Sequence, residues 1–335
     1  MKAITACFAK HRHAIALALG LGLICATPAH AEVKVGVSDW TGWVAWYVAD
    51  QKGFFKKHNA DVKLVWFANY TDSITALSSG KLDANSQTWS DTMGPLAKGI
   101  PLKAILVNDN SAGNDAIMVS PKIKSFADLK GKTIALEEFS ISHFVLATAL
   151  TKNGMAPGDV KIVNLSAGDA AAAFIAGRVQ AAVVWNPWIH QIEKSGKGRA
   201  IFSSREMPGL VPDLLVAQDK ALKAKRKDFV GMVKAWYDTE KFIRQNPDEA
   251  VKIMSKVVGM KPEEYKVFLP GTRFFDEKAN LDGPGRQWRQ VIGCRRACHC
   301  PVPAEKQADR RHTRLRQRHR CQRDAGSCQE VRKSP

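Results

Sequence analysis

The stretches ITALSSGKLDA (74–84) and AAAFIAGRVQA (171–181) follow one pattern at two distant places in the chain. Each reads as a helix that ends at a glycine, Gly80 or Gly177, followed by a short polar step and the start of a strand. The similarity has two interpretations. It is either the generic chemistry of a helix, a glycine and a strand, or it marks two similar α/β lobes in one polypeptide.

Short apolar runs alternate with amphipathic stretches around these two segments. The runs read as buried strands at Val33–Val37, Val62–Trp66, Ala104–Val107, Thr133–Leu136, Lys161–Val163 and Ala181–Val184. The amphipathic stretches read as helices at Val44–Lys57, Ser73–Ser79, Thr92–Lys98, Ile141–Asn153 and Ala170–Ala176. This alternation predicts an α/β fold with parallel strands and right-handed crossovers. From Lys220 to Phe268 the pattern is helical, and Pro247 and Pro262 mark the starts of helices.

Two further runs predict strands that cross between the lobes. They are Asp115–Val119 (DAIMV) and Asp213–Ala217 (DLLVA). The second lobe then comprises residues 116–213 and is inserted into the first. The first lobe is discontinuous and comprises residues 32–115 and 214–285.

Residues 1–31 predict a cleavable secretory signal. Lys2, Lys10 and Arg12 form a positive start, and residues 14–27 are apolar but too short to span a bilayer comfortably. Residues 29–31 (AHA) fit the cleavage pattern, so the mature protein is expected to begin at Glu32, in the periplasm.

The charge of the chain is unevenly distributed. The formal net charge is +18, but residues 32–285 hold 33 basic and 28 acidic residues, while residues 286–335 hold 14 basic and 4 acidic ones. The globular part is therefore only mildly basic, and no nucleic-acid partner is expected. Five of the seven cysteines also lie in residues 286–335, and residues 32–285 contain none.

Residues 286–335 contain few large apolar side chains, so disorder is expected there. We favour the hypothesis that this tail is an out-of-frame translation that has replaced a final amphipathic helix. The alternative is a functional Arg-rich tail. The spacing of Cys294, Cys298 and Cys300 fits no common zinc module.

Residues 32–285 carry no P-loop, HExxH or GxSxG motif. Their histidines, His58, His143 and His190, lie far apart in the sequence, and no metal-ligand spacing is present. The sequence therefore predicts neither an enzyme nor a site for a metal or cofactor.

Aromatic and short polar residues follow the predicted strands, and ligands of open α/β sheets bind outside the carboxyl ends of strands. The candidate ligand-binding residues are Trp40, Trp43, Tyr70, Trp89, Ser90, Asp109, Glu137, Ser140, Trp185 and Asn186. Each tryptophan could instead pack in the core, which is the interpretation we prefer for Trp46 and Trp66. The serines could simply cap helices.

The charges near these strand ends are mostly negative. Carboxylates occur at Asp39, Asp91, Asp109, Glu137 and Glu138, and no arginine lies among them. If several of them face the cleft, a purely anionic ligand would be repelled. Carboxylates beside tryptophan faces suit a cationic or amine-bearing ligand.

Four segments carry a resemblance to a known family. They are VGVSDWTGWVAWYVADQKGFFKKH (35–58), ITALSSGKLDA (74–84), FADLKGKTIAL (126–136) and AAFIAGRVQAAVVWNPW (172–188). Over about residues 33–285 the chain resembles periplasmic substrate-binding proteins of ABC transporters, in the nitrate/sulfonate/taurine and thiamine-pyrimidine (NMT1-like) group. The resemblance implies a type II periplasmic binding protein, with two α/β lobes joined by a two-strand hinge.

The resemblance also implies a function. A monomeric protein of this kind captures a small-molecule ligand in a cleft that closes, delivers it to a permease in the inner membrane and performs no chemistry. By motif position the implied site residues are Trp40, Trp43, Trp89, Ser90, Ser140, Trp185 and Asn186.

Ligand identity does not carry over from the resemblance. The ligand is expected to be sulfonate-like, taurine-like or nitrate-like, or else a thiamine pyrimidine precursor or another amine-bearing compound. The rival is an enzyme related to thiamine-pyrimidine synthase, which shares the fold but needs a cysteine-rich motif. Residues 32–285 have no cysteine.

Overall fold

The computed structural model describes residues 32–282 of the chain. The predicted signal segment and its cleavage point, the predicted disordered tail and the frameshift hypothesis all lie outside the described residues. No helix within residues 32–282 is long and apolar enough to cross a membrane.

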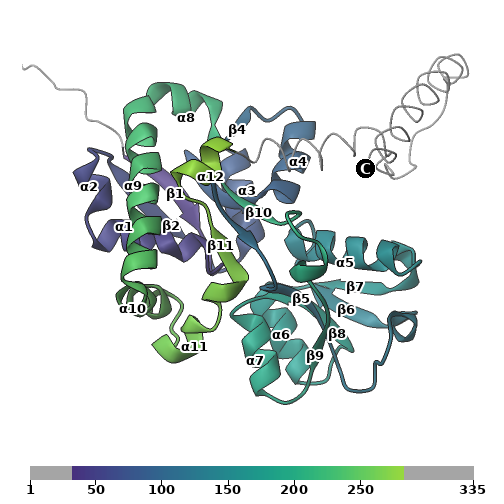
Figure 1. Ribbon diagram of the computed structural model, residues 1–335. Coiled ribbons are helices and arrows are strands. Elements are labelled where there is room, and N and C mark those ends of the chain that lie inside the picture. Colours follow the sequence, from purple (N-terminus) through teal and green to yellow (C-terminus); the bar gives the residue numbers. More distant parts are fainter. Residues whose placement is uncertain (1–31, 283–335) are drawn as a thin grey trace, which may run out of the picture. The chain divides into compact units, whose positions relative to one another are not determined.

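Six strands form the first sheet, in the order β11-β4-β10-β3-β1-β2 (Figure 1). Their bounds are β1 Val33–Val37, β2 Val62–Trp66, β3 Ala84–Thr88, β4 Leu102–Ser111, β10 Pro212–Gln218 and β11 Thr272–Phe274. Strand β1 pairs in parallel with β2 and β3, and β10 lies antiparallel between β3 and β4. The predicted strands at 33–37 and 62–66 are therefore confirmed with their bounds.

Five strands form the second sheet, in the order β7-β6-β8-β5-β9. Their bounds are β5 Asp115–Val119, β6 Thr133–Leu136, β7 Lys161–Asn164, β8 Ala181–Trp185 and β9 Arg199–Ser203. Strand β6 pairs in parallel with β7 and β8, and β5 lies antiparallel between β8 and β9. Below, the first sheet with its covering helices is called the first lobe, and the second sheet with α5, α6 and α7 the second lobe.

The two sheets share one topology. Strands β2, β1, β3, β10 and β4 of the first sheet occupy the same successive positions as β7, β6, β8, β5 and β9 of the second. The two similar sequence stretches form α3–β3 and α6–β8, which are equivalent in this comparison. Gly80 and Gly177, with φ of 76° and 74°, end the two helices in the left-handed conformation that glycine adopts without strain. The repeat thus marks two similar lobes.

Helices cover both sheets (Figure 1). The helix bounds are α1 Trp46–Gln51, α2 Phe54–Lys57, α3 Tyr70–Ser78, α4 Trp89–Ala97, α5 Ile141–Lys152, α6 Ala167–Ile175, α7 Trp188–Lys194, α8 Asp219–Ala224, α9 Arg226–Gln245, α10 Pro247–Val257, α11 Pro262–Lys266 and α12 Glu277–Asp282. Short 3₁₀ turns are η1 Trp43–Ala45, η2 Phe126–Leu129, η3 Pro157–Asp159, η4 Ser204–Glu206 and η5 Leu269–Gly271. Pro247 and Pro262 each begin a helix, as predicted.

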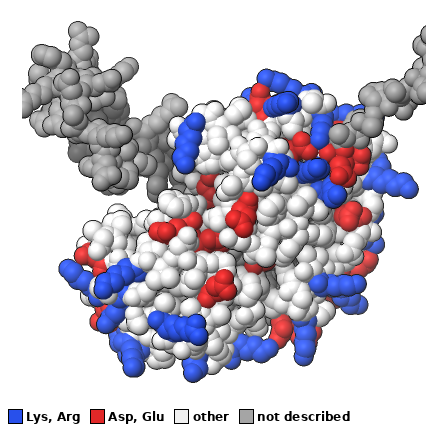
Figure 2. All heavy atoms as spheres, turned by 180° about the vertical axis from the view of Figure 1, so that it is seen from behind, with Lys and Arg blue, Asp and Glu red and all other residues white. Residues whose placement is uncertain are grey.

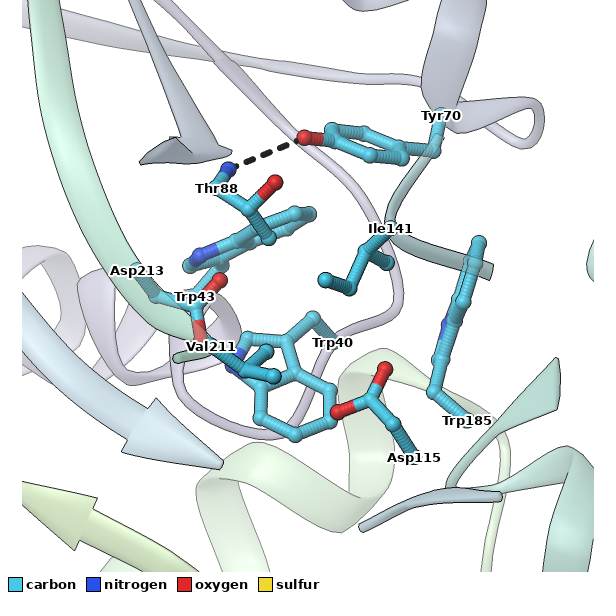
Figure 3. Close-up of a pocket in the computed structure, with 9 residues that line it drawn as sticks. All are labelled: Trp40, Trp43, Tyr70, Thr88, Asp115, Ile141, Trp185, Val211 and Asp213. Carbon is cyan, nitrogen blue, oxygen red and sulfur yellow. Dashed lines mark hydrogen bonds between the residues drawn. The ribbon is translucent and has the colours of Figure 1, made fainter. Parts of the chain in front are cut away.

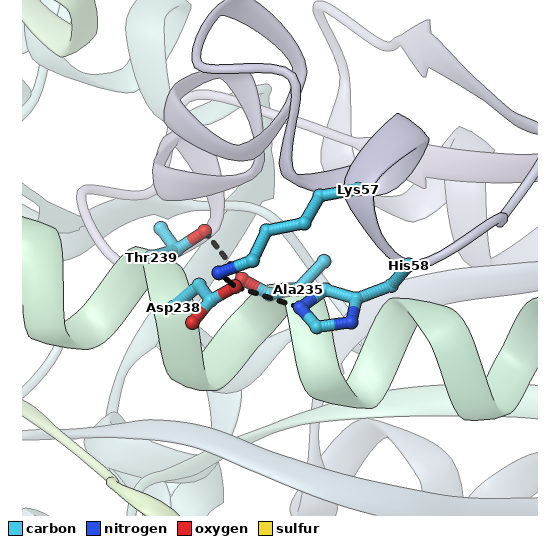
Figure 4. A network of polar contacts seen from close by, with 5 residues as sticks. All are labelled: Lys57, His58, Ala235, Asp238 and Thr239. Carbon is cyan, nitrogen blue, oxygen red and sulfur yellow. Dashed lines mark hydrogen bonds and ion pairs between the residues drawn. The ribbon is translucent and has the colours of Figure 1, made fainter.

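One predicted helix is divided. The stretch 44–57 forms η1, α1 and α2 instead of a single helix. Gly53, with φ of 70°, breaks the helical path between α1 and α2. The short helix α2 is held against α9 by an acidic side chain of that helix. Asp238 Oδ2 lies 2.7 Å from Lys57 Nζ and 2.7 Å from His58 Nε2 (Figure 4).

The sequence predicted that the strands at 115–119 and 213–217 cross from one lobe to the other, and this prediction is wrong. Both runs are strands, but β5 lies inside the second sheet and β10 inside the first. The chain passes between the sheets in the segments 112–114 and 204–211. These segments run beside the C-terminal part of the chain, because the Ala112 nitrogen donates to the Gly271 oxygen over 2.8 Å.

The two tryptophans assigned to the core differ in the structure. Trp46 is fully buried, stacks on Phe55 and donates from Nε1 to Ser86 Oγ over 3.0 Å. Trp66 is 40% exposed, so its assignment to the core is wrong. It ends β2, which is an edge strand of the first sheet and has a neighbouring strand on one side alone.

Candidate functional site

A small pocket with a free volume of about 10 Å³ lies where the two lobes meet (Figure 3). Its lining residues are Trp40, Trp43, Tyr70, Thr88, Asp115, Ile141, Trp185, Val211 and Asp213. In the first lobe they come from the loop after β1 and the start of η1, the start of α3, the end of β3 and the start of β10, and Val211 lies in the connecting segment just before β10. The second lobe contributes the starts of β5 and α5 and the end of β8. The pocket therefore stands at strand ends of both sheets.

Four aromatic rings in contact form the wall of this pocket. The ring centroids of Trp40 and Trp43 are 6.5 Å apart, those of Trp43 and Tyr70 are 4.8 Å apart, and those of Tyr70 and Trp185 are 5.9 Å apart. The last pair is edge-to-face and joins the two lobes. All four side chains are buried, because the lobes cover them from both sides.

Trp40 is fixed by a buried carboxylate. Its Nε1 donates to Asp109 Oδ1 over 3.0 Å. Asp109 itself packs against Gly42, where an added Cβ would lie 1.9 Å from Asp109 Oδ2. The glycine in the motif WTGW (40–43) therefore lets the loop approach this carboxylate closely.

Asp39 joins the lobes through two indoles. Its carboxylate accepts from Trp185 Nε1 over 2.9 Å and from Trp188 Nε1 over 2.7 Å. Burial raises the pKa of Asp39 to about 6, although the two indole donors lower it. The loop after β1 thus holds the end of β8 and the start of α7.

Asp91 makes a second contact between the lobes. Its Oδ2 accepts from Tyr70 Oη over 2.9 Å and from the backbone nitrogen of Ile141, at the start of α5, over 3.0 Å. Tyr70 Oη also accepts from the Thr88 nitrogen over 3.0 Å. Burial raises the pKa of Asp91 to about 6, and hydrogen bonds from its neighbours lower it.

Glu137 makes the reciprocal contact from the second lobe. Its Oε1 accepts from the backbone nitrogen of Thr71, in the first turn of α3, over 2.6 Å. Burial raises the pKa of Glu137 to about 7, and the charges of Asp39 and Asp91 raise it further. The N-termini of α3 and α5 therefore each receive a carboxylate from the opposite lobe, as the positive end of a helix favours.

Asp115 and Asp213 line the pocket and are 3% and 1% exposed. The Oδ2 atom of Asp115 has no hydrogen-bond partner within residues 32–282. The Oδ2 atom of Asp213 also has no hydrogen-bond partner there. Asp213 lies opposite Asp109 on the neighbouring strand, and the two carboxyl groups can share a proton. Burial raises the pKa of Asp115 to about 7. Burial, together with the carboxylates of Asp109 and Asp115, raises the pKa of Asp213 well above its usual range.

A wider groove of about 740 Å³, partly open to solvent, runs along the outer side of the same junction. It lies between α3 and α4 of the first lobe and residues 138–147 of the second. Ser90 and Ser140 line it, together with Asp91. Ser140 Oγ accepts from the Ser142 nitrogen over 3.1 Å as the cap of α5, and Ser90 Oγ donates to Asp91 Oδ1 over 2.7 Å.

The structure brings four of the predicted site residues together in one pocket: Trp40, Trp43, Tyr70 and Trp185. Asp109 lies behind Trp40, and Glu137 holds the lobes together. Trp89 lies apart from this pocket, half-buried against the cluster of Leu77, Leu82 and Leu214. Asn186 is buried and donates from Nδ2 to Asn114 Oδ1 over 3.0 Å.

The sequence interpretation missed Asp115, Asp213, Ile141, Val211 and Trp188 as parts of the site. Asp115 and Asp213 open the runs DAIMV and DLLVA, which were assigned to crossing strands. A charged residue at the start of a wholly buried strand is a signal that could have been followed, because such a group needs a partner. Trp188 ends the quoted motif AAVVWNPW (181–188).

Acidic side chains are concentrated near the junction of the lobes. Figure 2 shows Asp and Glu gathered toward the middle of one face, with Lys and Arg mostly toward its margin. Within residues 32–282, no group of three His, Cys, Asp or Glu side chains could hold a metal ion.

Two similar lobes, each with one strand that runs antiparallel between its two neighbours, and a pocket between them define the class of fold: that of periplasmic binding proteins. Residues 40–250 match the NMT1/THI5 like family, which covers more than half of the chain, so the protein belongs to that family. The family and fold class predicted from the sequence are therefore confirmed.

Individual relatives agree with this assignment. A binding protein of Brucella abortus (strain 2308) is 29% identical over 231 residues, which are 67% of this chain and 70% of that protein. The taurine-binding periplasmic protein of Escherichia coli (strain K12) is 31% identical over 144 residues, 43% of this chain and 45% of that protein. The alkanesulfonate-binding protein SsuA from Xanthomonas axonopodis pv. citri, bound to MOPS, superimposes with a TM-score of 0.67. Its identity is 20%, and the match covers 81% of this chain and 96% of that one.

Proposed function

We propose that this chain is the solute-binding component of an ABC importer. In the periplasm it captures a small polar ligand between its lobes and passes it to a permease in the inner membrane. Relatives named for taurine and alkanesulfonate binding support this role, as does membership of the family.

The composition of the pocket is the observation that carries the proposal. Trp40, Trp43 and Asp213 come from the first lobe, and Asp115 and Trp185 from the second. A ligand in this pocket touches both lobes, so it binds the closed arrangement better than an open one. Ligand binding then favours closure, which gives a permease a ligand-dependent surface to recognise.

The candidate residues divide into two groups in this proposal. Trp40, Trp43, Tyr70 and Trp185 contact the ligand directly, while Asp109, Glu137 and Asn186 fix the surrounding loops. Ser90 and Ser140 line the groove on the outer side of the junction, which is the route for entry of the ligand. Trp89 packs against Leu77, Leu82 and Leu214 and supports the start of α4 instead of contacting the ligand. The lobes in this proposal have the bounds expected from the sequence, residues 32–115 with 214–285 and residues 116–213, except that Asp115 belongs to the second lobe with β5 and residues 212–213 belong to the first lobe with β10.

Further parts of the proposal concern the whole protein. The mature chain begins at Glu32 after cleavage behind Ala31, acts as a monomer and releases its ligand chemically unchanged. The named relatives include binders of taurine and aliphatic sulfonates, so sulfonates head the list of test solutes, followed by nitrate, pyrimidine precursors and amines.

Titration of the full chain with these solutes tests the proposal. We expect at least one solute to change the tryptophan fluorescence and raise the melting temperature, because a ligand that binds the native state alone stabilises it. Small-angle scattering should show contraction at saturation, and NMR should show an intact solute after prolonged incubation. Trp185→Phe should weaken binding, while Trp66→Phe, the same change on β2, should not.

Two results would contradict the proposal. Conversion of a solute into a product would favour the enzyme alternative, for which the buried carboxyl groups with raised pKa would be the acid–base candidates. A well-folded protein that binds no member of the panel would argue against a solute-binding role altogether.

A further inference from the structure

The helix N-termini at the lobe junction are already occupied by the protein's own carboxylates. The Thr71 nitrogen of α3 donates to Glu137 over 2.6 Å, and the Ile141 nitrogen of α5 donates to Asp91 over 3.0 Å. Helix N-termini are sites where proteins commonly bind anions. An anionic ligand at either position would have to displace a buried carboxylate, and the released carboxylate would repel it.

The polar groups of the aromatic side chains are largely used as well. Trp40 Nε1 donates to Asp109, Trp185 Nε1 donates to Asp39, and Tyr70 Oη donates to Asp91. These side chains therefore offer the ligand their ring faces instead of their donors. Trp43 Nε1 has no partner within residues 32–282 and remains able to donate to a neutral polar group.

Apart from Tyr70, the titratable groups that line the pocket are two carboxyl groups. Asp115 and Asp213 are buried, and Figure 3 shows the Asp115 carboxylate between Trp40 and Trp185. Each has an Oδ2 atom without a donor, apart from the proton that Asp213 can share with Asp109. None of the nine described residues that line the pocket is Lys, Arg or His. A buried carboxylate without a donor is costly unless a ligand supplies one.

Aromatic faces beside buried carboxylates form a recognised environment for an organic cation. The ring quadrupole attracts positive charge at the face, most strongly for tryptophan, and the attraction increases when the site is desolvated. Three tryptophans and one tyrosine surround this pocket, and all four are buried. No group of three ligating side chains within residues 32–282 could hold a metal ion, which favours an organic cation over a metal.

We propose that the pocket is selective for a small organic cation, with an ammonium-type group seated between Asp115 and Asp213 and its carbon atoms against the tryptophan faces. This inference rests on the proposed solute-binding function and narrows its ligand class to cations, against the sulfonates that named relatives bind. The free volume of about 10 Å³ is room for about one water molecule, so the ligand is small and the lobes must move apart to admit it.

Proton linkage gives the proposal a characteristic pH dependence. The titratable groups around the pocket are carboxyl groups and tyrosines: Asp39, Asp91, Asp109, Asp115, Glu137, Asp213, Tyr70 and Tyr265. Burial and mutual repulsion raise the pKa values of these carboxyl groups, so part of the cluster is protonated near neutrality. A cation stabilises the ionised forms, so its binding releases protons and strengthens as the pH rises from about 6 to about 8. An anion has the opposite dependence.

Three two-carbon solutes separate the alternatives: ethylammonium, taurine and ethanesulfonate. Ethylammonium carries an ammonium group and ethanesulfonate carries a sulfonate group. Taurine carries both groups. Calorimetric titration of the full chain, in two buffers of different ionisation enthalpy, measures affinity and proton release together. We expect ethylammonium to bind with proton release, taurine to bind more weakly and ethanesulfonate not to bind. Tetramethylammonium and guanidinium extend the cation series in size.

Asp115→Asn removes one charge and keeps the shape of the side chain. We expect it to weaken cation binding by about tenfold or more, as the loss of a charge-assisted contact implies. Asp50→Asn, the same change on the exposed end of α1, should leave the affinity unchanged. Because the buried cluster repels itself, Asp115→Asn should not lower the melting temperature, so lost binding would not reflect unfolding. Asp213→Asn provides a second, independent variant.

The failures of the two proposals are distinguishable. Binding of ethanesulfonate or nitrate that strengthens toward about pH 6 would overturn the cation inference and leave the solute-binding function intact. Binding of calcium in place of the organic cations would also overturn it. If no charged or neutral solute binds to the folded protein, the proposed function and the cation inference are both wrong.

Discussion

The carboxylate of Glu137 accepts a hydrogen bond of 2.6 Å from the backbone nitrogen of Thr71, although the two residues belong to different lobes. Glu137 follows β6 of the second sheet, and Thr71 lies in the first turn of α3. Asp91 makes the mirror-image contact from the first lobe to Ile141 of α5. The lobes are therefore joined by two carboxylates that each end on a helix N-terminus of the other lobe.

This arrangement predicts that Glu137→Ala shifts the lobes toward an open state. The substitution leaves the Thr71 nitrogen without its acceptor in the closed arrangement, and a buried donor without a partner costs about 1–3 kcal/mol. We expect a larger radius of gyration for the ligand-free variant and weaker ligand binding. Glu138→Ala, the same change on the next residue, should do neither. Identical scattering curves for Glu137→Ala and the parent protein would show that this contact does not hold the lobes closed.

The buried carboxyl groups predict an unusual dependence of stability on pH. Burial raises the pKa values of Asp39 and Asp91 to about 6 and those of Asp115 and Glu137 to about 7. The unfolded chain releases these protons near pH 4, whereas the folded protein keeps them until about pH 6–7. The ligand-free protein is therefore expected to lose stability as the pH rises through that window.

Denaturant unfolding at about pH 5 and about pH 8 measures this effect. Each unit by which one pKa is raised corresponds to about 1.4 kcal/mol, so several groups together should make the difference easily detectable. Carboxyl groups with lowered pKa, such as Asp219 beside Lys223, lose their contributions at lower pH and do not obscure the result. Asp115→Asn should reduce the slope. Equal or greater stability at about pH 8 would contradict the raised pKa values.

Substitution of two different tryptophans by alanine should change the stability of the protein by very different amounts. Trp46 is fully buried between Phe55 and Trp236, so Trp46→Ala should cost about 3–5 kcal/mol of unfolding free energy. Trp66 is 40% exposed at the edge of the first sheet, so Trp66→Ala should cost about 1 kcal/mol or less. Thermal or chemical unfolding of the two variants measures both values. Similar losses would mean that Trp66 is packed more closely than its exposure indicates.

The same pair shows how far the sequence can predict the fold. Local patterns suffice for strands such as Val33–Val37, because a buried parallel strand must be a continuous apolar run. The exposure of Trp66 depends on whether another strand follows β2 in the sheet, and that depends on long-range order. Apolar composition alone therefore could not separate Trp46 from Trp66.

The sequence also predicted only part of the candidate site. The aromatic residues after strand ends were found because strand ends are where such folds bind ligands, and three tryptophans and Tyr70 indeed meet there. Asp115 and Asp213 were missed as site residues because their positions follow from the sheet register. Asp213 becomes a neighbour of Asp109 only when β10 pairs with β4, and that pairing joins segments far apart in the chain.

The last prediction concerns Gly42, because the pocket needs a residue without a side chain at this position of the loop after β1. A Cβ at this position would lie 1.9 Å from Asp109 Oδ2, and the three nearest atoms all belong to that carboxylate. Gly42→Ala should therefore displace Asp109 and break its hydrogen bond from Trp40 Nε1. We expect a loss of about 1–3 kcal/mol in stability, as overpacking of a buried site costs, together with weaker ligand binding. Gly94→Ala in α4, where an added Cβ meets open space, should be neutral or stabilising by up to about 1 kcal/mol. If Gly42→Ala binds ligand and unfolds like the parent protein, the Trp40–Asp109 contact is not needed for the pocket, and the role assigned to Asp109 is wrong.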